Sequence, residues 1–565
     1  MSTVTTNYDD RFAALRSCRF TPEEPEEREI KKPIYTLDTE TDPFQYGRFP
    51  RPFVAAVYDG QRYTSFWGDD CIDRCHEFLQ TLPPGIVYAH NGGKFDFLYF
   101  LKYLKNQECL IINRRIVKID LPCRHGKHEL RDSLAIFPFA LKGYQKDEID
   151  YALMEQGKRE KHRSEILEYL RGDCIYLYEL CEAFHKRFGP RLTIGGTAMA
   201  EIRARHDFQT LSAEDDFAIR GGKDSEGILR QGFYYGGRVQ CFKKGTIKGK
   251  WKVYDVNSMY PFVMRNYLHP LCAPSWESRK PSKHTCFIIA EGKNYGAFPQ
   301  RTKTGLTFDV EEGTFHVSIH EWKVALEHGL FEPSKIIKCI NFGERGNFRQ
   351  FVDDFYEGKK AAKLAGDKIR ELMYKYVLNS GYGKFAQNPD HYKNYLITDQ
   401  SEETVTNMIE GGWQGGEILE GENDGYFVWE RNADDHSRYN VATAASITGA
   451  ARSVLLDAIA RANDPIYCDT DSIICRCLDG VNFSDSELGA WKLEAEADTA
   501  CIGGKKLYAL FLKRKCVKQA NKGARITAAE IRKVCDGATV EYKRDAPSIG
   551  LDGSYRFLTR KVRMT

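Results

Sequence analysis

The 565-residue sequence lacks the features that mark membrane, secreted and repetitive proteins. It has no run of eighteen apolar residues, so no membrane-spanning helix is expected. Residues 1–30 contain an acidic run, Glu23–Glu29, but no apolar core of the kind that a signal peptide needs. Long low-complexity tracts and a repeat period are also missing. These absences predict an ordinary globular protein that is neither secreted nor membrane-spanning, and its length predicts three or four structural units.

Overall charge and cysteine content are equally unspecific. The 82 Lys and Arg residues nearly balance the 79 Asp and Glu residues, and a net charge of +3 does not indicate a nucleic-acid partner. The 17 cysteines are odd in number and scattered, which predicts reduced thiols rather than disulfides. The one zinc-like group, Cys123 with His125 and His128, matches no common structural site and has no second half nearby.

Positive charge is nevertheless unevenly distributed along the chain. Residues 511–565 contain 14 Lys and Arg residues against 5 Asp and Glu residues. Such an excess attracts a phosphate backbone, although a solvated basic tail would have the same composition. This stretch is therefore a candidate nucleic-acid surface that composition alone does not establish.

Residues 464–475 predict a β-hairpin whose turn region carries two carboxylates. Apolar runs flank the sequence Tyr467-Cys468-Asp469-Thr470-Asp471-Ser472. In an extended backbone side chains repeat every second residue, so Asp469 and Asp471 are expected on one face. A divalent cation would relieve their repulsion, which indicates a site for metal and phosphate. A surface turn also favours Asp and Thr, so the hairpin alone does not decide between the two interpretations.

Acids recur in the first third of the chain. A short apolar strand carries Asp38 and Glu40, again two residues apart and on one face. A second strand leads through a Gly-rich turn into a helix expected over Phe95–Leu104, which Asp96 opens. An acidic pair on a strand is common, and Asp96 has an ordinary alternative role as a helix N-cap.

A third element in this region is a helix predicted from Ile166 to Phe184. Tyr169 and Asp173 lie four residues apart on one of its faces, where a packed aromatic and an exposed helix turn are the ordinary alternatives. Together with Asp38, Glu40 and Asp96, Asp173 completes a set of four carboxylates that suits two Mg²⁺ ions. The tyrosine would position the attacking water.

The remaining two thirds of the chain contain a second group of this kind. Asp255 lies at the end of a predicted strand, where it can join Asp469 and Asp471 around a second pair of metals. Between them, Lys375, Asn379 and Tyr382 recur at i, i+4 and i+7. A cation, an amide and an aromatic on one helix face suit phosphate, sugar and base, although a partly buried amphipathic helix would look similar.

In this order, the two groups resemble the motifs of family B DNA polymerases. Asp38-x-Glu40, Asn91 with Asp96, and Tyr169-xxx-Asp173 look like the three motifs of the proofreading exonuclease. The segments that contain Asp255-xx-Ser258-Met259-Tyr260, Lys375-xxx-Asn379-Ser380-x-Tyr382 and Tyr467-x-Asp469-Thr470-Asp471 resemble polymerase motifs A, B and C.

The resemblance also implies roles for single residues of the exonuclease half. Lys146 is similar to a lysine that the protein-primed branch of the family adds to the exonuclease site, where it would counter developing negative charge. Asn91, Phe95, Ser133 and Leu134 match positions that grip the single-stranded primer end in that branch.

In the polymerase half, the resemblance implies that Asp255 and Asp471 hold the metals and that Asp469 supports them. Lys375 would meet the triphosphate, and Tyr382 the incoming base and sugar. Tyr260 would exclude a 2′-hydroxyl and so select deoxynucleotides. Further nucleotide-binding positions are Ser258, Met259 and Asn379. The expected DNA-binding positions, in three short motifs, are Tyr234, Gly236, Gly237, Thr448, Arg452, Lys506 and Tyr508.

Two long segments, residues 271–356 and 389–440, resemble the insertions of protein-primed polymerases. In that branch one insertion contacts a terminal protein, whose hydroxyl replaces the RNA primer, and the other encircles DNA for processivity and strand displacement. Stretches such as Tyr88–Leu98 and Thr193–Met199 look closest to polymerases of the tailless, internal-membrane bacteriophages, the tectiviruses. This similarity implies a linear viral genome, the cytoplasm of a bacterial host, and a monomer or a 1:1 heterodimer with terminal protein.

We therefore expect an α+β protein with a ribonuclease-H-like 3′–5′ exonuclease domain followed by a right-hand polymerase domain. The expected cofactor is Mg²⁺, two ions per active site, for which Mn²⁺ can substitute, and the expected substrates are a DNA primer-template and deoxynucleoside triphosphates. A nuclease with a decayed polymerase half and a non-catalytic replication scaffold are the alternatives. Retention of all the expected acids disfavours both alternatives, since a pure DNA binder loses from Asp facing phosphate.

The resemblance implies the following division of the chain. The expected limits are 1–30 for a flexible extension, 31–200 for the exonuclease domain, 201–250 for a linker and the start of the polymerase module, 251–270 for the palm with motif A, 271–356 for the first insertion, 357–388 for the fingers, 389–440 for the second insertion, 441–510 for the palm with motif C, and 511–565 for the thumb.

Overall fold

The computed structural model describes residues 27–43, 50–104, 106–141, 148–211, 225–303, 305–387, 393–398, 401–420, 425–432, 440–521, 523–543, 548–549, 555–557 and 559–564. None of the helices in these ranges combines the length and hydropathy of a membrane span. All sixteen cysteines in these ranges are free thiols, as the composition predicts.

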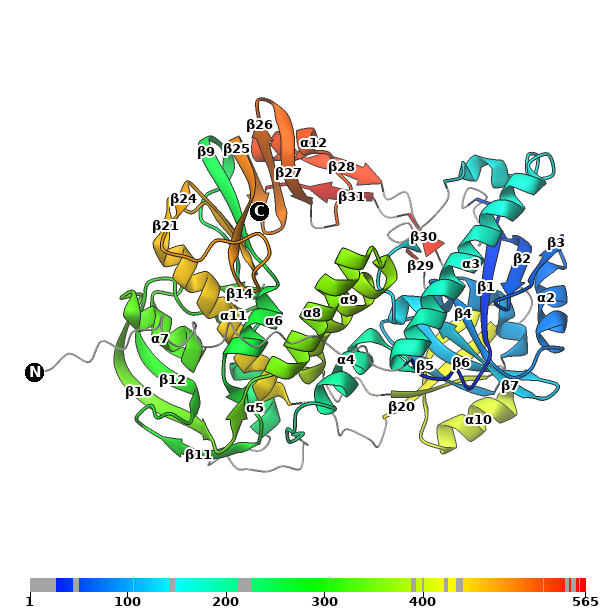
Figure 1. Cartoon of the computed structure of the whole chain (residues 1–565), viewed down its shortest axis with the longest axis horizontal. Coiled ribbons are helices and arrows are strands. Elements are labelled where there is room, and N and C mark those ends of the chain that lie inside the picture. The colour runs from blue at the N-terminus through cyan, green and yellow to red at the C-terminus, as the bar shows by residue number, and fades with distance from the viewer. Residues whose placement is uncertain are drawn as a thin grey trace, which may run out of the picture.

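A ten-stranded sheet forms the part of the molecule that contains the first acids (Figure 1, right). Its strand order is β19-β20-β18-β5-β6-β7-β4-β1-β2-β3, with β4 parallel to both β1 and β7. Helices α2 (Cys71–Leu79) and α3 (Arg163–Phe188) pack against it. The seven strands of the first third are β1 (Ile34–Thr41), β2 (Pro52–Tyr58), β3 (Tyr63–Trp67), β4 (Ile86–Ala89), β5 (Gln107–Ile111), β6 (Ile116–Cys123) and β7 (Gly126–Asp132).

Three strands of this sheet come from the second insertion, which lies almost 300 residues further along the chain. The strands β18 (Lys393–Thr398), β19 (Gln414–Glu420) and β20 (Gly425–Asn432) extend it beyond β5, and α10 (Glu402–Glu410) connects the first two. The sequence predicts no conformation for the Gly-rich segment after residue 411. In the structure it contributes β19, which pairs with β20 in an antiparallel hairpin. The second insertion is thus joined to the first domain by backbone hydrogen bonds.

The first insertion has a sheet of its own (Figure 1, lower left). The strand order is β11-β16-β12-β15, and α7 (Ile319–Glu327) packs on it through Trp322 and Ala325. A short hairpin, β13 (Gln300–Thr302) and β14 (Gly305–Thr307), projects from this unit. The other strands are β10 (His269–Pro270), β11 (Pro274–Ser278), β12 (Thr285–Asn294), β15 (Glu312–Ser318), β16 (Phe331–Phe342) and β17 (Arg345–Gly346).

The second group of acids lies on a seven-stranded antiparallel sheet with the order β27-β26-β25-β9-β23-β22-β8. Its inner strands are almost entirely apolar on the face that packs against the long buried helix α11 (Val441–Arg461). The strands are β8 (Val239–Cys241), β9 (Gly245–Val256), β22 (Tyr467–Asp469), β23 (Ser472–Cys475), β25 (Trp491–Gly504), β26 (Leu507–Leu512) and β27 (Lys515–Asn521). A small pair, β21 (Ala462–Asn463) and β24 (Cys477–Leu478), lies at its edge.

Two antiparallel helices, α8 (Arg349–Ala365) and α9 (Lys368–Phe385), lie between the two large sheets (Figure 1). α8 begins eight residues before the expected start of the fingers at residue 357. One apolar core joins these helices to α3, α4 (Ile194–Arg203), α6 (Met259–Asn266) and α11. The parallel rings of Phe139 and Tyr376, 5.3 Å apart, add a contact between the first domain and α9. The two halves therefore share an interface rather than a bare linker.

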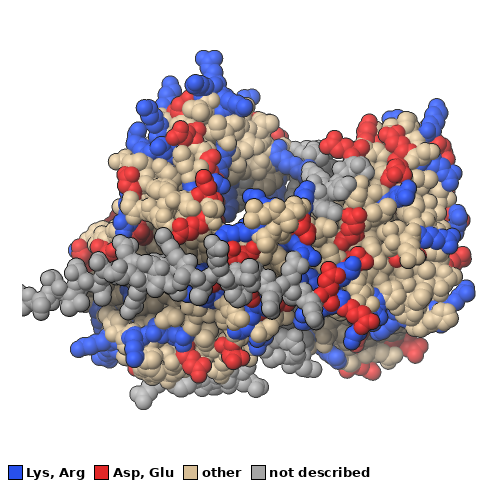
Figure 2. Space-filling view, in the orientation of Figure 1, with Lys and Arg blue, Asp and Glu red and all other residues tan. Residues whose placement is uncertain are grey.

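The basic C-terminal stretch continues the seven-stranded sheet through β27 and then packs α12 (Ala528–Cys535) on it. Lys513, Arg514 and Lys515 are exposed where β26 turns into β27, and Figure 2 shows Lys and Arg side chains gathered over this tip. Short pairs follow, in β28 (Val540–Lys543) with β31 (Thr559–Val562) and β29 (Ser548–Ile549) with β30 (Tyr555–Arg556). A further helix of the described residues is α5 (Ser225–Gly232).

Candidate active sites

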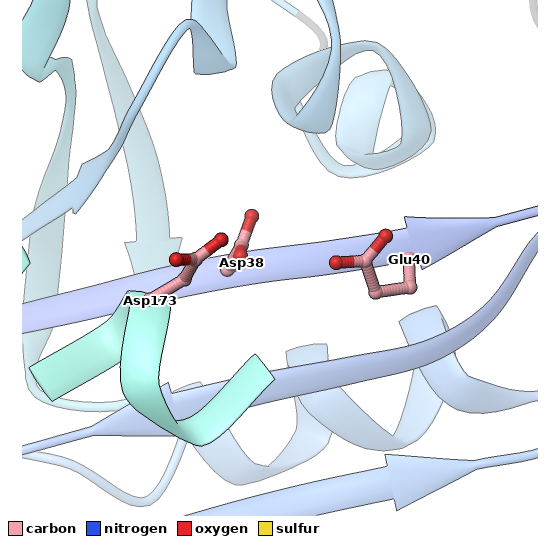
Figure 3. A group of neighbouring side chains, drawn as sticks. All are labelled: Asp38, Glu40 and Asp173. Carbon is pink, nitrogen blue, oxygen red and sulfur yellow. The ribbon is translucent and has the colours of Figure 1, made fainter. Parts of the chain in front are cut away.

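Three carboxylates converge in the first domain. Asp38 and Glu40 lie on β1 and Asp173 lies on α3, and one oxygen from each lies within 4.8 Å of the other two. Figure 3 shows the three side chains gathered between the strand and the helix. The Thr36 hydroxyl donates a 2.8 Å hydrogen bond to the Cys174 carbonyl and so fixes α3 against β1. Three hard oxygen donors at this spacing form a ligand set for a divalent cation.

Asp96 lies beside this group but is not one of its three members. It is buried and accepts a 2.6 Å hydrogen bond from the Thr39 hydroxyl, while burial raises its pKa to about 7. Burial, followed by the charges of Asp38, Asp173 and Asp96, raises the pKa of the Cys174 thiol, which places all three acids near that side chain. Asp96 is therefore poised at the margin of the cluster, where a bound cation would favour its ionised form.

The helix that Asp96 opens differs from the expected one. It is a 3₁₀ helix over Asp96–Tyr103, and its N-cap residue is Phe95, so the alternative role of Asp96 as an N-cap is wrong. Tyr169 and Asp173 do share one face of α3, as predicted. The hydroxyl groups of Tyr169 and Tyr151 are 3.2 Å apart, and burial raises the pKa of Tyr169 above its usual range. Lys146 lies outside the described residues.

The expected primer-gripping residues surround a buried acid that the sequence analysis missed. Asp132 accepts hydrogen bonds from the backbone amides of Asn91, Gly93 and Leu134 and pairs with Arg115 at 2.6 Å. Asn91 itself has a left-handed backbone, with φ of 68°. Asp132 fixes a turn that lies 41 and 39 residues earlier in the chain, at Asn91 and Gly93. The only signal for this role in the sequence is therefore the position of Asp132 next to Ser133 and Leu134.

Ser133 is placed differently from the expectation. Its side chain is completely buried, and its hydroxyl is 2.9 Å from Nδ1 of His90. Direct contact with a primer strand is therefore wrong for the Ser133 side chain in this structure, where its hydroxyl also donates to the Ala89 carbonyl at 3.3 Å. Phe95 and Leu134 remain partly exposed.

The second site brings together Asp255 at the end of β9 and Asp471 in the hairpin turn. Ser472 pairs with Asp255 across the two strands, and the Val256 amide donates a 2.8 Å bond to the Asp471 carbonyl. Burial, and then the charge of Asp471, raises the pKa of Asp255 to about 7. Burial is also the largest cause that raises the pKa of Asp471, to about 6, and neighbouring acids add to it. Two neighbouring carboxylates whose ionised forms are both disfavoured by burial and nearby acids are suited to bind a cation.

The predicted hairpin is present, but the two acids do not reach one face by strand alternation. Asp469 ends β22 and pairs with Ser472, so Thr470 and Asp471 form a two-residue turn in which Thr470 has φ of 59°. The extended-backbone argument is therefore wrong. Asp469 instead pairs with Lys506 Nζ at 3.0 Å and accepts a hydrogen bond from the Tyr467 hydroxyl. Asp255, Asp469 and Asp471 do not form a group within 4.8 Å in the part of the chain that the structure describes.

A fourth acid of this site, Glu494 on β25, was missed by the sequence analysis. Its charge is among the causes that raise the pKa of both Asp255 and Asp471, and its side chain forms an ion pair with Lys518. Asp255 pairs with Lys492 across β9 and β25. No local signal distinguishes Glu494 from its neighbour Glu496, because only the pairing of β25 with β9 brings it to the site.

The expected nucleotide-binding residues lie on α6, at its N-cap and on α9. The rings of Tyr260 and Tyr382 stack in parallel, with centroids 3.8 Å apart and an interplanar angle of 6°. Lys375 and Asn379 are exposed on the same helix as Tyr382. Ser258 is the N-cap of α6 with φ of 55°, and the Met259 side chain is buried, so only its backbone is available to a nucleotide.

Three expected DNA-binding side chains are instead largely buried. Thr448 and Arg452 on α11 are 1% and 2% exposed, and Arg452 forms a buried pair with Glu321 of α7. Direct DNA contact by these two side chains is therefore wrong for this structure. Tyr508 is 6% exposed and packs against Tyr467, which leaves little of its ring free. Lys506, by contrast, is half exposed beside Asp469.

Comparison with known proteins identifies several relatives. The family model "DNA polymerase type B, organellar and viral" matches residues 142–474. The chain is 44% identical over 569 aligned residues to the DNA-directed DNA polymerase of Enterobacteria phage PRD1, covering 95% of this chain and 99% of that one. It is 25% identical to a probable DNA polymerase of Podospora anserina, over 63% of this chain but 32% of that one.

Solved structures of Phi29 DNA polymerase have the same fold. The complex with primer-template DNA and incoming nucleotide matches with a TM-score of 0.67 at 18% identity, over 95% of this chain and all of that one. An orthorhombic crystal form of the same polymerase matches with a TM-score of 0.68 at 19% identity, over 94% of this chain. At this identity the match establishes the fold alone, and it confirms the expected mixed α and β fold of two parts over nearly the whole chain.

Proposed function

The chain belongs to the type B DNA polymerases, organellar and viral, of the protein-primed kind, and we propose that it replicates a linear viral genome from a terminal-protein primer, with 3′–5′ proofreading. DNA-directed DNA polymerase activity follows from the family. Priming by a terminal protein, proofreading by the first domain, strand displacement and a two-metal mechanism at each site are the proposed refinements.

One observation carries the proposal: a single chain holds two separate groups of converging acids. Asp38, Glu40 and Asp173 lie between a strand and a helix of the ten-stranded sheet. Asp255 and Asp471 lie on the other large sheet. A proofreading polymerase needs two such centres, because hydrolysis and nucleotidyl transfer require different placements of the primer end.

Both groups fit divalent cations, because each gathers carboxylates that repel one another when ionised. Asp255 and Asp471 would hold Mg²⁺ in the polymerase site, as Asp38, Glu40, Asp96 and Asp173 would in the exonuclease site, and Mn²⁺ would substitute. When bound, these ions activate the attacking oxygen and stabilise charge on the phosphate. Asp469 would support the site through its links to Lys506 and Tyr467.

In the polymerase site the protein's own residues select and orient the nucleotide. Lys375 would meet the triphosphate, and Ser258, Met259 and Asn379 would contact the nucleotide beside it. An incoming nucleotide has to separate the stacked rings of Tyr260 and Tyr382, which then enclose its sugar and base. Lys506 would bind the primer terminus. The exposed cations at the β26–β27 turn would hold duplex phosphates.

In the exonuclease site, Tyr169 would orient the attacking water and Lys146 would counter negative charge on the departing phosphate. Asn91, Phe95 and Leu134 would hold the unpaired primer end. Asp132 fixes the turn that carries Asn91, and Phe95 immediately precedes Asp96. Hydrolysis would then compete with extension for the same primer terminus.

Terminal-protein priming is proposed from the two insertions and the similarity to the phage PRD1 polymerase. The first insertion forms a separate four-stranded sheet, and the second extends the ten-stranded sheet of the first domain. The partner would be a terminal protein in a 1:1 complex with a monomeric polymerase, and the compartment would be the cytoplasm of a bacterial host.

A gel assay tests the proposed activities together. A 5′-labelled primer annealed to a longer template is incubated with the enzyme and Mg²⁺. Extension with deoxynucleotides and shortening without them are expected, and chelation of the metal should stop both. Shortening alone would indicate a nuclease with a decayed polymerase half, and DNA binding without either product would indicate a scaffold.

Tyr260 is expected to control sugar selection. Replacing it with alanine should raise ribonucleotide insertion relative to deoxynucleotide insertion by about 10- to 200-fold, because space opens below the sugar ring. The ratio of kcat/KM for dCTP and CTP measures the effect. Tyr260→Phe keeps the ring and should keep the discrimination. Unchanged discrimination in Tyr260→Ala would contradict the assignment.

Protein priming has a direct test. The enzyme is mixed with a candidate terminal protein, Mg²⁺ and one labelled deoxynucleotide, without any nucleic-acid primer. We expect a labelled protein band that resists denaturation and disappears on protease treatment. Absence of this band, in a preparation that extends an ordinary DNA primer, would count against the protein-primed assignment alone.

A further inference from the structure

We propose that two side chains of the first insertion, Arg301 and Glu321, are positioning residues of the polymerase centre. They act through a connecting loop, residues 234–238, on the hairpin that carries Asp469 and Asp471. The inference rests on the proposed function of that hairpin. It adds a second role for the insertion, independent of any contact with terminal protein.

The connecting loop lies directly against the acidic hairpin. The Thr470 amide donates a 2.7 Å hydrogen bond to the Arg238 carbonyl, and the next residue, Val239, pairs with Asp469 in the sheet. A Cβ atom added at Gly237 would be 2.8 Å from the methyl and hydroxyl groups of Thr470. At this closeness a displacement of the loop has to displace the turn that presents Asp471.

The Arg452 side chain, from α11, binds the backbone of the connecting loop. Its Nη1 donates to the carbonyls of Tyr235 at 2.7 Å and Gly236 at 2.9 Å. Its Nε and Nη2 donate to the two carboxylate oxygens of Glu321, at 2.7 and 3.0 Å. Both side chains are 2% exposed. A bidentate pair in a buried place fixes the plane of the guanidinium, so Glu321 determines where Arg452 holds the loop.

Glu321 is itself held firmly within the first insertion. It is the third residue of α7 and forms a capping box with Ser318. α7 packs closely on α11, since a Cβ at Gly449 would come within 2.4 Å of the Ser318 hydroxyl. The carboxylate that orients Arg452 is therefore part of a rigid contact between the insertion and the palm.

Arg301 lies on the β13–β14 hairpin of the first insertion and binds the backbone of Tyr234. This residue directly precedes the two that Arg452 binds. Its Nη2 donates to the Tyr234 carbonyl at 2.9 Å, and its guanidinium lies 5.3 Å from the centre of the Tyr235 ring. The Arg452 guanidinium lies 5.5 Å from the same ring. Three consecutive loop carbonyls, at residues 234 to 236, thus accept hydrogen bonds from two arginines.

The β13–β14 hairpin and the residue after it make two further contacts, one with the connecting loop and one with the turn between β25 and β26. The Phe308 ring lies 4.1 Å from the Arg238 guanidinium, and Lys505 Nζ donates to the Leu306 carbonyl at 2.8 Å. Lys505 precedes Lys506, the partner of Asp469. The insertion therefore contacts both segments that lie against the hairpin carrying Asp469 and Asp471. If this acidic hairpin is displaced, the chemical step should be slower while substrate binding is unchanged.

Steady-state kinetics of Arg301→Ala on a primer-template test the proposal. We expect kcat for extension to fall about 10- to 100-fold, with KM for the nucleotide and Kd for the primer-template within about twofold of wild type. Arg301→Lys, which can still donate to the Tyr234 carbonyl, should recover part of the loss. Lys303→Ala removes a neighbouring exposed charge and should behave as wild type. The exonuclease rate of each preparation serves as the control for folding.

Glu321→Gln provides an independent variant on the other arginine. It should lower kcat in the same way and be less than additive with Arg301→Ala, because both act on one loop. If Glu321→Gln also loses the exonuclease, it has failed to fold and Arg301 alone decides. Wild-type kcat in Arg301→Ala would overturn the proposal, and so would a loss of DNA affinity at unchanged kcat, which would mean direct DNA contact. Failure of the proposed polymerase function would differ, because wild type itself would then extend no primer.

Discussion

Replacing Asp471 with asparagine is expected to abolish primer extension and to leave the exonuclease intact. The carboxylate lies in the hairpin turn opposite Asp255. Burial raises the pKa of both acids, the charge of Asp471 adds to the shift of Asp255, and the charges of Asp469 and Glu494 add to that of Asp471. An amide of the same shape removes the charge that would hold this cation. A loss in kcat of about 10³-fold or more is expected, the scale seen when one electrostatic group of an active site is removed.

The same substitution should not destabilise the protein. The pKa of Asp471 is raised to about 6 in the fold, so its ionised form at pH 7.5 is less favourable in the folded than in the unfolded chain. This penalty is absent below the unfolded pKa, grows as pH rises from the unfolded to the folded value, and is fully present above the folded value. A neutral amide avoids it, and the Tm of metal-free Asp471→Asn should equal or exceed that of wild type.

Two controls accompany the Asp471 experiment. Asp479→Asn removes an exposed acid from the segment that follows the same hairpin and should extend primers like wild type. Degradation of a single-stranded oligonucleotide by Asp471→Asn reports on the other site. Full extension by Asp471→Asn would remove the acid from the catalytic centre and the two-metal proposal with it.

Replacing Asp38 with asparagine is expected to have the opposite effect. The Asp38 carboxylate is one of three that lie within 4.8 Å of each other, so its loss leaves Glu40 and Asp173 without the third ligand of the group. Shortening of a labelled primer in the absence of nucleotides should fall about 10³-fold. Extension should persist at the wild-type rate, since the polymerase acids lie on another sheet.

Mispaired primers make the second prediction sharper. Wild type should remove a mismatched 3′ end before extending, whereas Asp38→Asn should extend it slowly or stop. Glu168→Gln, on the exposed face of the same helix as Asp173, is the matched control and should proofread normally. Loss of both activities in Asp38→Asn would indicate that the variant disturbs the shared core rather than one site.

The elements that carry the acids could be predicted because each is encoded locally. On β1, Asp38 and Glu40 are both partly exposed on either side of the buried Thr39, as a period of two residues predicts. A four-residue spacing places Tyr169 and Asp173 on one face of α3. The hairpin at Tyr467–Cys475 follows from its apolar flanks. In these cases a period of two or of 3.6 residues is enough to assign a face.

The predictions that failed concern side chains whose surroundings come from distant segments. Arg452 looked like a DNA contact until Glu321, 131 residues earlier in the chain, was found beside it. Ser133 is buried because His90 and the strand that precedes it cover the turn. Charge and polarity in a sequence indicate what a side chain can bind, but not which partner reaches it first.

By itself, the sequence determined the family and the order of two groups of candidate acids, because these depend on residue type, spacing and local periodicity. Only the tertiary structure decided that Asp471 reaches Asp255 through a turn, that Glu494 joins them, and that the second insertion extends the exonuclease sheet. Each of these depends on pairing between strands far apart in the chain. Such pairing is selected by the burial of whole sheets, which no local pattern specifies.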